Sequence, residues 1–307
     1  MKCSGGVAIL QRSCFWKNLM IYIRNLNTHM KRYMKMSRVI RVGSRESKLA
    51  MVQTQWVVNE IKKKHPELEF EIKGFTTKGD ILLNDRLDKV GGKGLFIKEL
   101  EYALINGDID IAVHSLKDMP AELPENLTIA AVSRREDPRD VLVTVDGLKL
   151  RDLPDGAVIG TSSVRREVQI SCMRPGMVYK TLRGNVLTRL KKLKDGEYDA
   201  IVLAAAGLKR LGIADSDCCI EYFDTDDVIP AVGQGILAIE ARKGDELGYL
   251  TDSVHDADSF YAALAERAFM IRLNGGCSVP MGAHAVIEGD IMKVKGMLAS
   301  EDKSKVI

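Results

Sequence analysis

Basic and hydroxyl side chains gather at three places where a strand pattern gives way to a helix pattern. The segments are GSRES at residues 43–47, GTSSVRR at 160–166 and LRGN at 182–185. The free backbone N–H groups of a helix start attract anions, and arginine adds paired N–H donors. For any single turn of this kind, a helix N-cap with solvated charges is the favoured explanation, but three turns facing one cleft favour an anion site. Arginine points to a carboxylate ligand, with phosphate as the alternative.

An apolar strand pattern ends in a group of polar residues at 111–120, which read IAVHSLKDMP. In α/β sheets the carboxyl end of such a strand lines the ligand crevice. An Asp118 carboxylate placed there, beside Lys117, can stabilise a cation or shuttle protons. The alternative is an ordinary turn aspartate with a solvated lysine next to it.

A cysteine follows two glycines in LNGGCSVP, at residues 273–280. Glycines allow a loop to approach a partner closely, so Cys277 is predicted to be an accessible thiol that serves as a nucleophile or an attachment point. The alternative is a buried cysteine that packs as a small hydrophobic residue. None of the six cysteines forms a C-x-x-C pair, so we predict no metal site. The cysteine pattern also favours a reducing cytoplasm.

Alternating strand and helix patterns predict the fold that positions these residues. The expected strands lie at 38–43, 69–74, 110–114, 127–132, 141–145, 157–160, 177–181 and 199–204. The expected helices begin at Ser47 and Phe96 and occupy 164–173 and 186–194. This alternation is typical of an α/β protein with mainly parallel sheets and helices on both faces. Two such units facing each other create a cleft, the usual place for a small ligand.

The later part of the chain indicates how these units are connected. An apolar strand at 236–241 can return to the first unit, which gives domain 1 (38–136 and 232–253) and domain 2 (137–231). A long amphipathic helix at 256–273 and strands within 283–299 form a small α+β domain 3 (254–307). No helix pattern follows those strands to cover them, so we expect domain 3 to be incomplete at its C-terminal end.

Charge is unevenly distributed along the chain. Residues 1–36 contain seven Lys or Arg and no Asp or Glu, which leaves 38 basic and 42 acidic residues in the remainder. The segment 1–37 is expected to be a disordered basic extension. A transit peptide is one explanation for it, and an extension upstream of a start at Met34 or Met36 is the one we favour. The acidic remainder and the 6% aromatic content argue against nucleic-acid binding. No apolar run is long enough to span a membrane.

Taken in order, these segments resemble one family. The blocks GSRESKLA, GGKGLFIKELE, AVHSLKDMP, GTSSVRRE, LRGNVLTRL, AAAGLKRLG, IPAVGQG and LNGGCSVP follow the order of the porphobilinogen deaminases, from about Arg38 to about Ser300. The resemblance implies two α/β domains like those of type II periplasmic binding proteins, followed by a small third domain. It implies a transferase of haem biosynthesis that deaminates four porphobilinogen molecules and joins them head to tail into hydroxymethylbilane. The alternative is a non-catalytic two-lobed module that binds anions.

The resemblance also assigns roles to individual residues. Cys277 matches the cysteine that holds a dipyrromethane cofactor through a thioether, and Asp118 matches the catalytic aspartate. The cofactor-binding residues implied in this way are Lys117, Ser163, Arg165, Arg166, Arg183 and Gly184. The substrate-binding residues are Arg45, Ser47 and Arg189. We expect a cytoplasmic monomer whose partner is the small molecule porphobilinogen, with no metal, nucleic acid or membrane involved.

Overall fold

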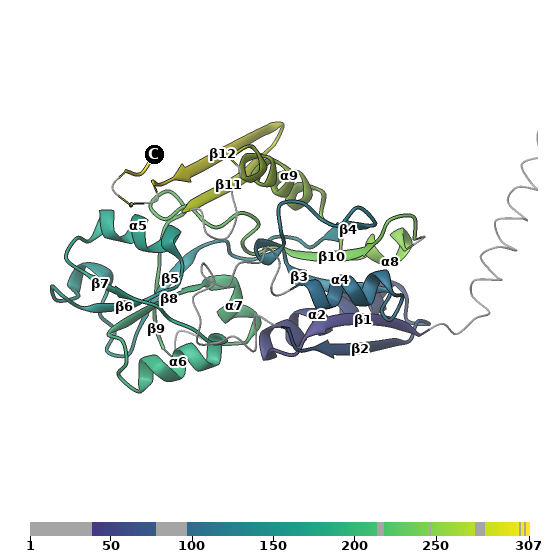
Figure 1. The fold of residues 1–307 in the computed structure, drawn as a ribbon, viewed down its shortest axis with the longest axis horizontal. Coiled ribbons are helices and arrows are strands. Elements are labelled where there is room, and N and C mark those ends of the chain that lie inside the picture. Colours follow the sequence, from purple (N-terminus) through teal and green to yellow (C-terminus); the bar gives the residue numbers. More distant parts are fainter. Residues whose placement is uncertain are drawn as a thin grey trace, which may run out of the picture. The chain divides into compact units, whose positions relative to one another are not determined.

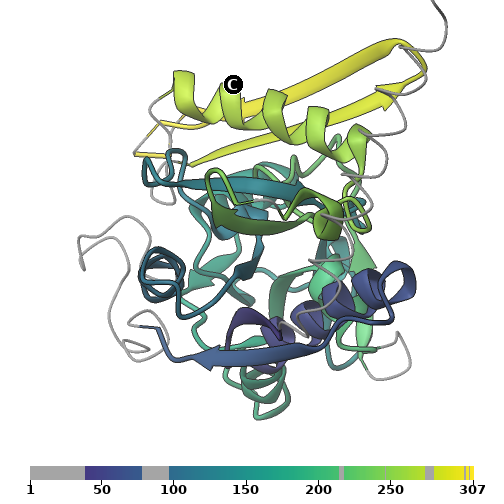
Figure 2. The same ribbon diagram turned by 90° about the vertical axis from the view of Figure 1, so that its right-hand side faces the viewer.

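The structure is a computed structural model. The residues it describes are 39–77, 97–213, 218–245, 247–273, 280–300, 302–303 and 305–307. Within these residues the strands form two five-stranded sheets and one two-stranded sheet (Figures 1 and 2). The predicted α/β class with a small α+β C-terminal part is confirmed. The expected extension at 1–37, the glycine-rich block at 91–94 and the cysteine at 277 lie outside the described residues.

The first sheet has the strand order β2-β1-β3-β10-β4. Its strands are β1 (Ile40–Arg45), β2 (Phe70–Phe75), β3 (Ile111–Ser115), β4 (Leu127–Val132) and β10 (Leu237–Arg242). β2 and β3 pair with β1 in parallel, whereas β10 runs antiparallel to both β3 and β4. The prediction that a strand near 236–241 returns to the first unit is therefore confirmed. β4 therefore runs in the same direction as β1, β2 and β3, and only β10 is reversed, so the prediction of a mainly parallel sheet is confirmed.

The second sheet has the order β7-β6-β8-β5-β9 and the same mixed character. Its strands are β5 (Asp140–Thr144), β6 (Val158–Gly160), β7 (Val178–Lys180), β8 (Ala200–Ala204) and β9 (Cys219–Tyr222). β6 pairs in parallel with β7 and β8, and β5 pairs antiparallel with β8 and β9. The sequence did not predict β9.

The described helices are α2 (Lys48–Lys64), α4 (Lys98–Ile105), α5 (Val164–Met173), α6 (Val186–Lys194), α7 (Ala205–Arg210), α8 (Gly248–Thr251) and α9 (Ala257–Arg272). They include the five that the sequence predicted, α2, α4, α5, α6 and α9, and two that it did not predict, α7 and α8. Two short 3-10 turns, η1 (Leu116–Asp118) and η2 (Leu150–Asp152), complete the set of described helical segments. No described helix is long and apolar enough to cross a membrane.

The first sheet packs a helix on each face. Val57 and Ile61 of α2 lie in one core cluster with Ile111 of β3. Ala112, the next residue of β3, lies in a second cluster with Leu100 of α4. Successive residues of a strand point to opposite faces, so α2 and α4 cover opposite sides of the sheet. Burial of each aliphatic side chain contributes about 1.5–3 kcal/mol to the stability of the fold. The packed clusters on both faces of the sheet therefore hold the end of β3 in place.

The C-terminal strands β11 (Met281–Glu288) and β12 (Ile291–Leu298) form an antiparallel hairpin. Helix α9 lies against this hairpin (Figure 2). The Phe269 ring packs over Gly296. The helix that covers these strands is the one predicted before them in the chain, and no described helix follows β12. β11 is largely buried, whereas most of β12 is exposed.

Two chain segments connect the two large sheets, and they run side by side. Arg135 Nη1 donates to the Gln234 carbonyl oxygen at 2.9 Å, and Glu136 N–H donates to the Gly235 carbonyl oxygen at 3.0 Å. The buried Glu266 of α9 binds both segments, since its carboxylate accepts from Arg135 Nη2 at 2.7 Å and from Gly233 N–H at 2.7 Å. Glu266 thereby connects α9 to both of the segments that join the two large sheets, which we call the crossing segments.

Candidate active site

Lys117 and Asp118 lie in η1, directly after β3. The turn is anchored by the buried Leu116, whose N–H donates to the Ile236 carbonyl oxygen at 2.9 Å. Asp118 is exposed and Lys117 is half-buried. The structure thus places the two residues at the carboxyl end of a central strand, as the sequence predicted.

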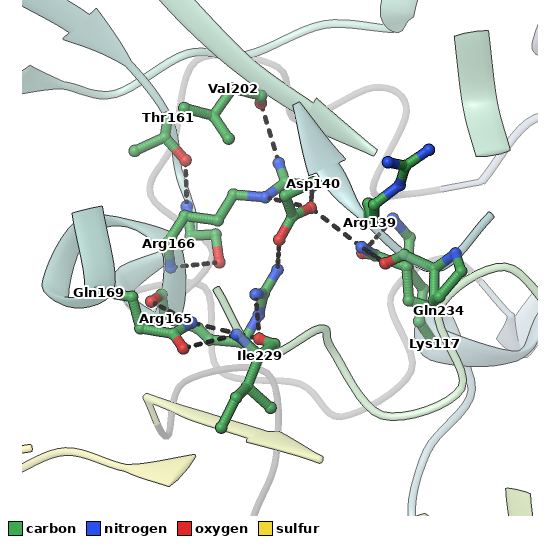
Figure 3. Close-up of polar contacts among 12 residues, drawn as sticks. Lys117, Arg139, Asp140, Thr161, Arg165, Arg166, Gln169, Val202, Ile229 and Gln234 are labelled. Atoms are coloured by element: carbon green, nitrogen blue, oxygen red, sulfur yellow. Dashed lines mark hydrogen bonds and ion pairs between the residues drawn. The ribbon is translucent and has the colours of Figure 1, made fainter. Parts of the chain in front are cut away.

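A buried carboxylate of the second sheet binds two of the predicted arginines (Figure 3). Asp140, the first residue of β5, accepts from Arg165 Nη2 at 2.6 Å and from Arg166 Nε and Nη2 at 3.0 and 2.7 Å. Arg165 also donates to the Ile229 carbonyl oxygen at 2.6 Å, and Arg166 donates to that of Val202 at 2.9 Å. Both arginines are buried, with exposed fractions of 5% and 7%. They are therefore not the solvated charges of the N-cap alternative.

The hydroxyl of Ser163, by contrast, does cap a helix. Its Oγ accepts from Arg166 N–H at 3.5 Å at the start of α5. Ser47 plays the same part for α2, where its Oγ accepts from Ala50 N–H at 3.3 Å. N-capping accounts for both serines locally, and a ligand role would come in addition to it.

The two sheets are joined at this place through Gln234. Its Nε2 donates to Asp140 Oδ1 at 3.0 Å, and its Oε1 accepts from Lys117 Nζ at 3.5 Å, the outer limit of a hydrogen bond. Burial lowers the pKa of Lys117 to about 8, with Asp118 opposing and Arg166 adding to the effect. Lys117 as a residue is only half-buried, but its ammonium group is enclosed by protein atoms, and this enclosure governs its charge.

Asp140 remains ionised in this position. Burial alone would raise its pKa, but the charges of Arg165 and Arg166 outweigh burial and hold the pKa well below its usual range. The pKa of Arg165 is lowered by burial in spite of Asp140.

The start of α6 brings two more cations to the same group. Arg189 Nε donates to the Gly184 carbonyl oxygen at 2.7 Å. The pKa of Arg189 is lowered to about 10, chiefly by burial and also by the nearby charges of Arg166 and Arg183, while Asp118 opposes the shift. Gly184 has φ +107°, and a Cβ there would lie 2.7 Å from a side-chain atom of Thr188, so only glycine suits this turn. Electrostatic interactions thus connect Lys117 with Asp118, Arg165 and Arg166, and they connect Arg189 with Asp118, Arg166 and Arg183.

Comparison with known proteins identifies the family of this chain. Residues 40–248 match the family described as porphobilinogen deaminase, dipyromethane cofactor binding domain, and residues 260–307 match the porphobilinogen deaminase C-terminal domain. The chain belongs to the porphobilinogen deaminase family. It is 51% identical over 272 residues to the porphobilinogen deaminase of Shouchella clausii (strain KSM-K16), covering 88% of this chain and 87% of that protein. It is also 51% identical over 269 residues to that of Bacillus subtilis (strain 168), covering 87% and 85%.

Among solved structures, the BenM effector binding domain with its effector benzoate aligns with a TM-score of 0.42 and 14% sequence identity. The alignment covers 78% of this chain and 94% of that one. A similarity at this level says nothing about the ligand of this porphobilinogen deaminase family member.

The remaining residues assigned by the resemblance, Arg45 and Ser47, lie where β1 meets α2. β1 pairs in parallel with β3, so the two strands present their carboxyl ends at the same edge of the sheet. Helix α2 also reaches the end of β3, since Ser115 Oγ donates to Gln53 Oε1 at 3.3 Å. Arg45 and Ser47 therefore share a sheet edge with Lys117 and Asp118. Cys277 lies outside the described residues.

Sequence reasoning missed two members of the site, Asp140 and Gln234. Asp140 directly precedes the apolar run VLVTV, and an ionisable residue at a buried strand needs a partner. That signal was available in the sequence. Gln234 stands between two glycines in one of the two segments that connect the large sheets. No local pattern in the sequence indicated which residues its side chain contacts.

Proposed function

We propose that this chain is a porphobilinogen deaminase, which deaminates four porphobilinogen molecules and joins them head to tail into hydroxymethylbilane for tetrapyrrole biosynthesis. The observation that carries the proposal is the group of cations around Asp118. Lys117, Arg165, Arg166 and Arg189 lie there together, and the carboxylates of Asp118 and Asp140 interact with them. Like charges crowded in a buried place call for an anionic ligand.

The chemistry of these donors fits an acidic pyrrole chain. Each porphobilinogen unit has an acetate and a propionate, so a cofactor built from two units brings several carboxylates. Guanidinium groups bind carboxylates through paired N–H donors, and a helix start adds backbone N–H groups. We assign cofactor binding to Lys117, Ser163, Arg165, Arg166, Arg183 and Gly184. We assign substrate binding to Arg45, Ser47 and Arg189.

Asp118 is the residue we assign to catalysis. When bound, the dipyrromethane cofactor supplies the primer to which pyrrole units are added. The Asp118 carboxylate is exposed at the end of a rigid strand, so substrate can reach it. There it can stabilise the positive charge that arises as the substrate loses ammonia, and it can take up a ring proton. Arg189, a neighbouring cation, can hold a substrate carboxylate beside it, and Lys117 can hold a carboxylate of the cofactor.

The other parts of the proposal concern the whole protein. We propose that Cys277 holds the cofactor by a thioether. We assign residues 38–136 with 232–253 to domain 1, 137–231 to domain 2 and 254–307 to domain 3. The enzyme is proposed to be a cytoplasmic monomer that needs no metal and acts on a small molecule, without nucleic acid or membrane.

Intact mass spectrometry tests this proposal. Folded protein that has met porphobilinogen should exceed its polypeptide mass by one dipyrrole, and the Cys277→Ser variant should have the bare mass. Cys172→Ser is the matched control, because Cys172 is exposed but has no assigned role, and it should load normally. Bare mass in the folded, substrate-exposed wild type would favour the non-catalytic anion-binding module instead. Full loading of Cys277→Ser would refute the attachment point.

A further inference from the structure

Asp140 lies at the centre of the buried network, yet none of the roles assigned above includes it (Figure 3). We propose that Asp140 is a positioning residue of the active site, whose carboxylate holds the Arg165 and Arg166 guanidinium groups in the orientation that receives the carboxylates of cofactor and substrate. The inference rests on the proposed function, because it concerns how the same site is kept ready for its ligands.

The geometry divides the Asp140 carboxylate between the two arginines. Oδ2 accepts from Arg165, and Oδ1 accepts two hydrogen bonds from Arg166. The carbonyl oxygens of Ile229 and Val202 hold the far sides of the two guanidinium groups. A guanidinium has more N–H donors than these contacts use, so donors remain for a ligand while the plane of each group is fixed.

The position of the carboxylate is itself set by the fold. Asp140 is paired with Ala204 in the ladder between β5 and β8, and its side chain is fully buried. Gln234 Nε2 fixes the carboxylate plane through its bond to Oδ1. Asp140 is therefore a rigid support, and the arginines are the groups that it orients.

Charge explains why this support is a carboxylate. Arg165 and Arg166 are adjacent in the chain and buried together, so their charges repel each other. The Asp140 carboxylate offsets one of the two charges and leaves the other for a ligand. Without it, two uncompensated cations would remain in a buried place, and each would turn toward water or another acceptor.

Asp140→Asn is the informative substitution, since asparagine has the same size but no charge. Its amide nitrogen is a donor, so one side of the group would meet guanidinium donors instead of accepting from them. We expect a smaller cofactor-loaded fraction. In the protein that does load, we expect the KM for porphobilinogen to rise about tenfold or more, the change for one weakened charged contact, while kcat changes less.

Asp137→Asn provides a matched control. Asp137 accepts from Arg139 Nε at 2.9 Å, from Arg139 Nη2 at 2.7 Å and from Lys209 Nζ at 2.9 Å. It thus binds two cations, as Asp140 does, only three residues earlier in the chain. Its partners have no assigned role, so Asp137→Asn should lower thermal stability and leave loading and KM unchanged.

The experiment compares both variants with the wild type by intact mass, by kcat and KM, and by thermal unfolding. Loss of loading or a raised KM in Asp140→Asn alone supports the inference. Loading and KM within twofold of those of Asp137→Asn would overturn it. A bare wild-type protein would instead signal failure of the proposed function, so the two failures are distinguishable.

Asp140→Glu covers the case in which Asp140→Asn does not fold. Glutamate keeps the charge but displaces the carboxylate by one methylene, so a positioning role predicts a raised KM in folded protein. A wild-type KM in this variant, or the absence of folded protein for both variants, would show that Asp140 serves the fold and not the site.

Discussion

Lys117 should give the enzyme an alkaline limit to its activity. Its pKa is lowered from 10.5 to about 8, chiefly by burial, while Asp118 and Asp140 oppose the shift and Arg165 and Arg166 add to it. The charged form therefore prevails below pH 8 and is lost as the pH rises through that value. If the ammonium group binds a carboxylate of the cofactor, to which each pyrrole unit is added, kcat/KM should fall over the same range.

The size of the effect follows from the titration. With a pKa of about 8, about nine in ten Lys117 groups are charged at pH 7 and about one in ten at pH 9. We therefore expect kcat/KM to fall about tenfold between pH 7 and pH 9. A lysine with its ordinary pKa of 10.5 would remain almost fully charged at both values.

The assay is kcat/KM for porphobilinogen from pH 6.5 to 9.5 in the wild type and in Lys117→Arg. Arg189, which is buried in the same group, keeps a pKa of about 10, so an arginine at position 117 should stay charged to pH 9 and abolish most of the decline. Lys191→Arg serves as the control, because Lys191 is exposed on α6 and pairs with Asp195. An identical alkaline decline in wild type and Lys117→Arg would refute the reasoning, since another group would then be titrating.

Three further predictions concern chemistry, backbone and metal. Asp118→Asn should lower kcat by about 10²–10⁴-fold while intact mass shows the cofactor retained, and near-normal turnover would contradict its catalytic role. Gly235→Ala should lower the free energy of unfolding by more than about 2 kcal/mol, because φ is +88° and a Cβ would lie 2.2 Å from the Glu136 carbonyl oxygen. Gly107→Ala, at φ +75° with nothing within 4 Å, should cost about 1 kcal/mol, and equal losses in urea unfolding would speak against this comparison. Dialysis against a chelator should leave turnover unchanged, and a loss restored by added metal would disprove the metal-free proposal.

Local signals made much of the fold predictable. The expected helices at 164–173 and 186–194 are confirmed residue for residue, because Ser163 and Asn185 supply N-cap side chains and charged or breaking residues follow each helix. Strand β10 was predicted because an apolar run follows the glycine-rich segment at 231–235. In these cases the information lies within a few residues of the element.

Features that depend on distant contacts could not be predicted. The direction of β10 is set by the path of the chain through the second sheet, which no local pattern records. The edge strand β9 is four residues long and only partly buried, so it has no clear periodicity.

The same limit applies to the site. Sequence motifs indicated the cations that we assign to it, but not that Asp140 pairs with two of them. Arg165 and Gln234 lie 25 and 94 residues away from that carboxylate in the chain. The contacts that determine their charge and orientation form only when the second sheet and the crossing segment meet.

The order of strands in the first sheet also has a consequence during synthesis. β4 has β10 as its strand neighbour, and every strand of the second sheet lies between the two in the chain. A nascent β4 therefore leaves the ribosome with its hydrogen-bonding groups unmatched and must wait until β10 emerges. Since an unmatched apolar strand invites association with other chains, the newborn protein is most vulnerable to aggregation in the interval between these two strands.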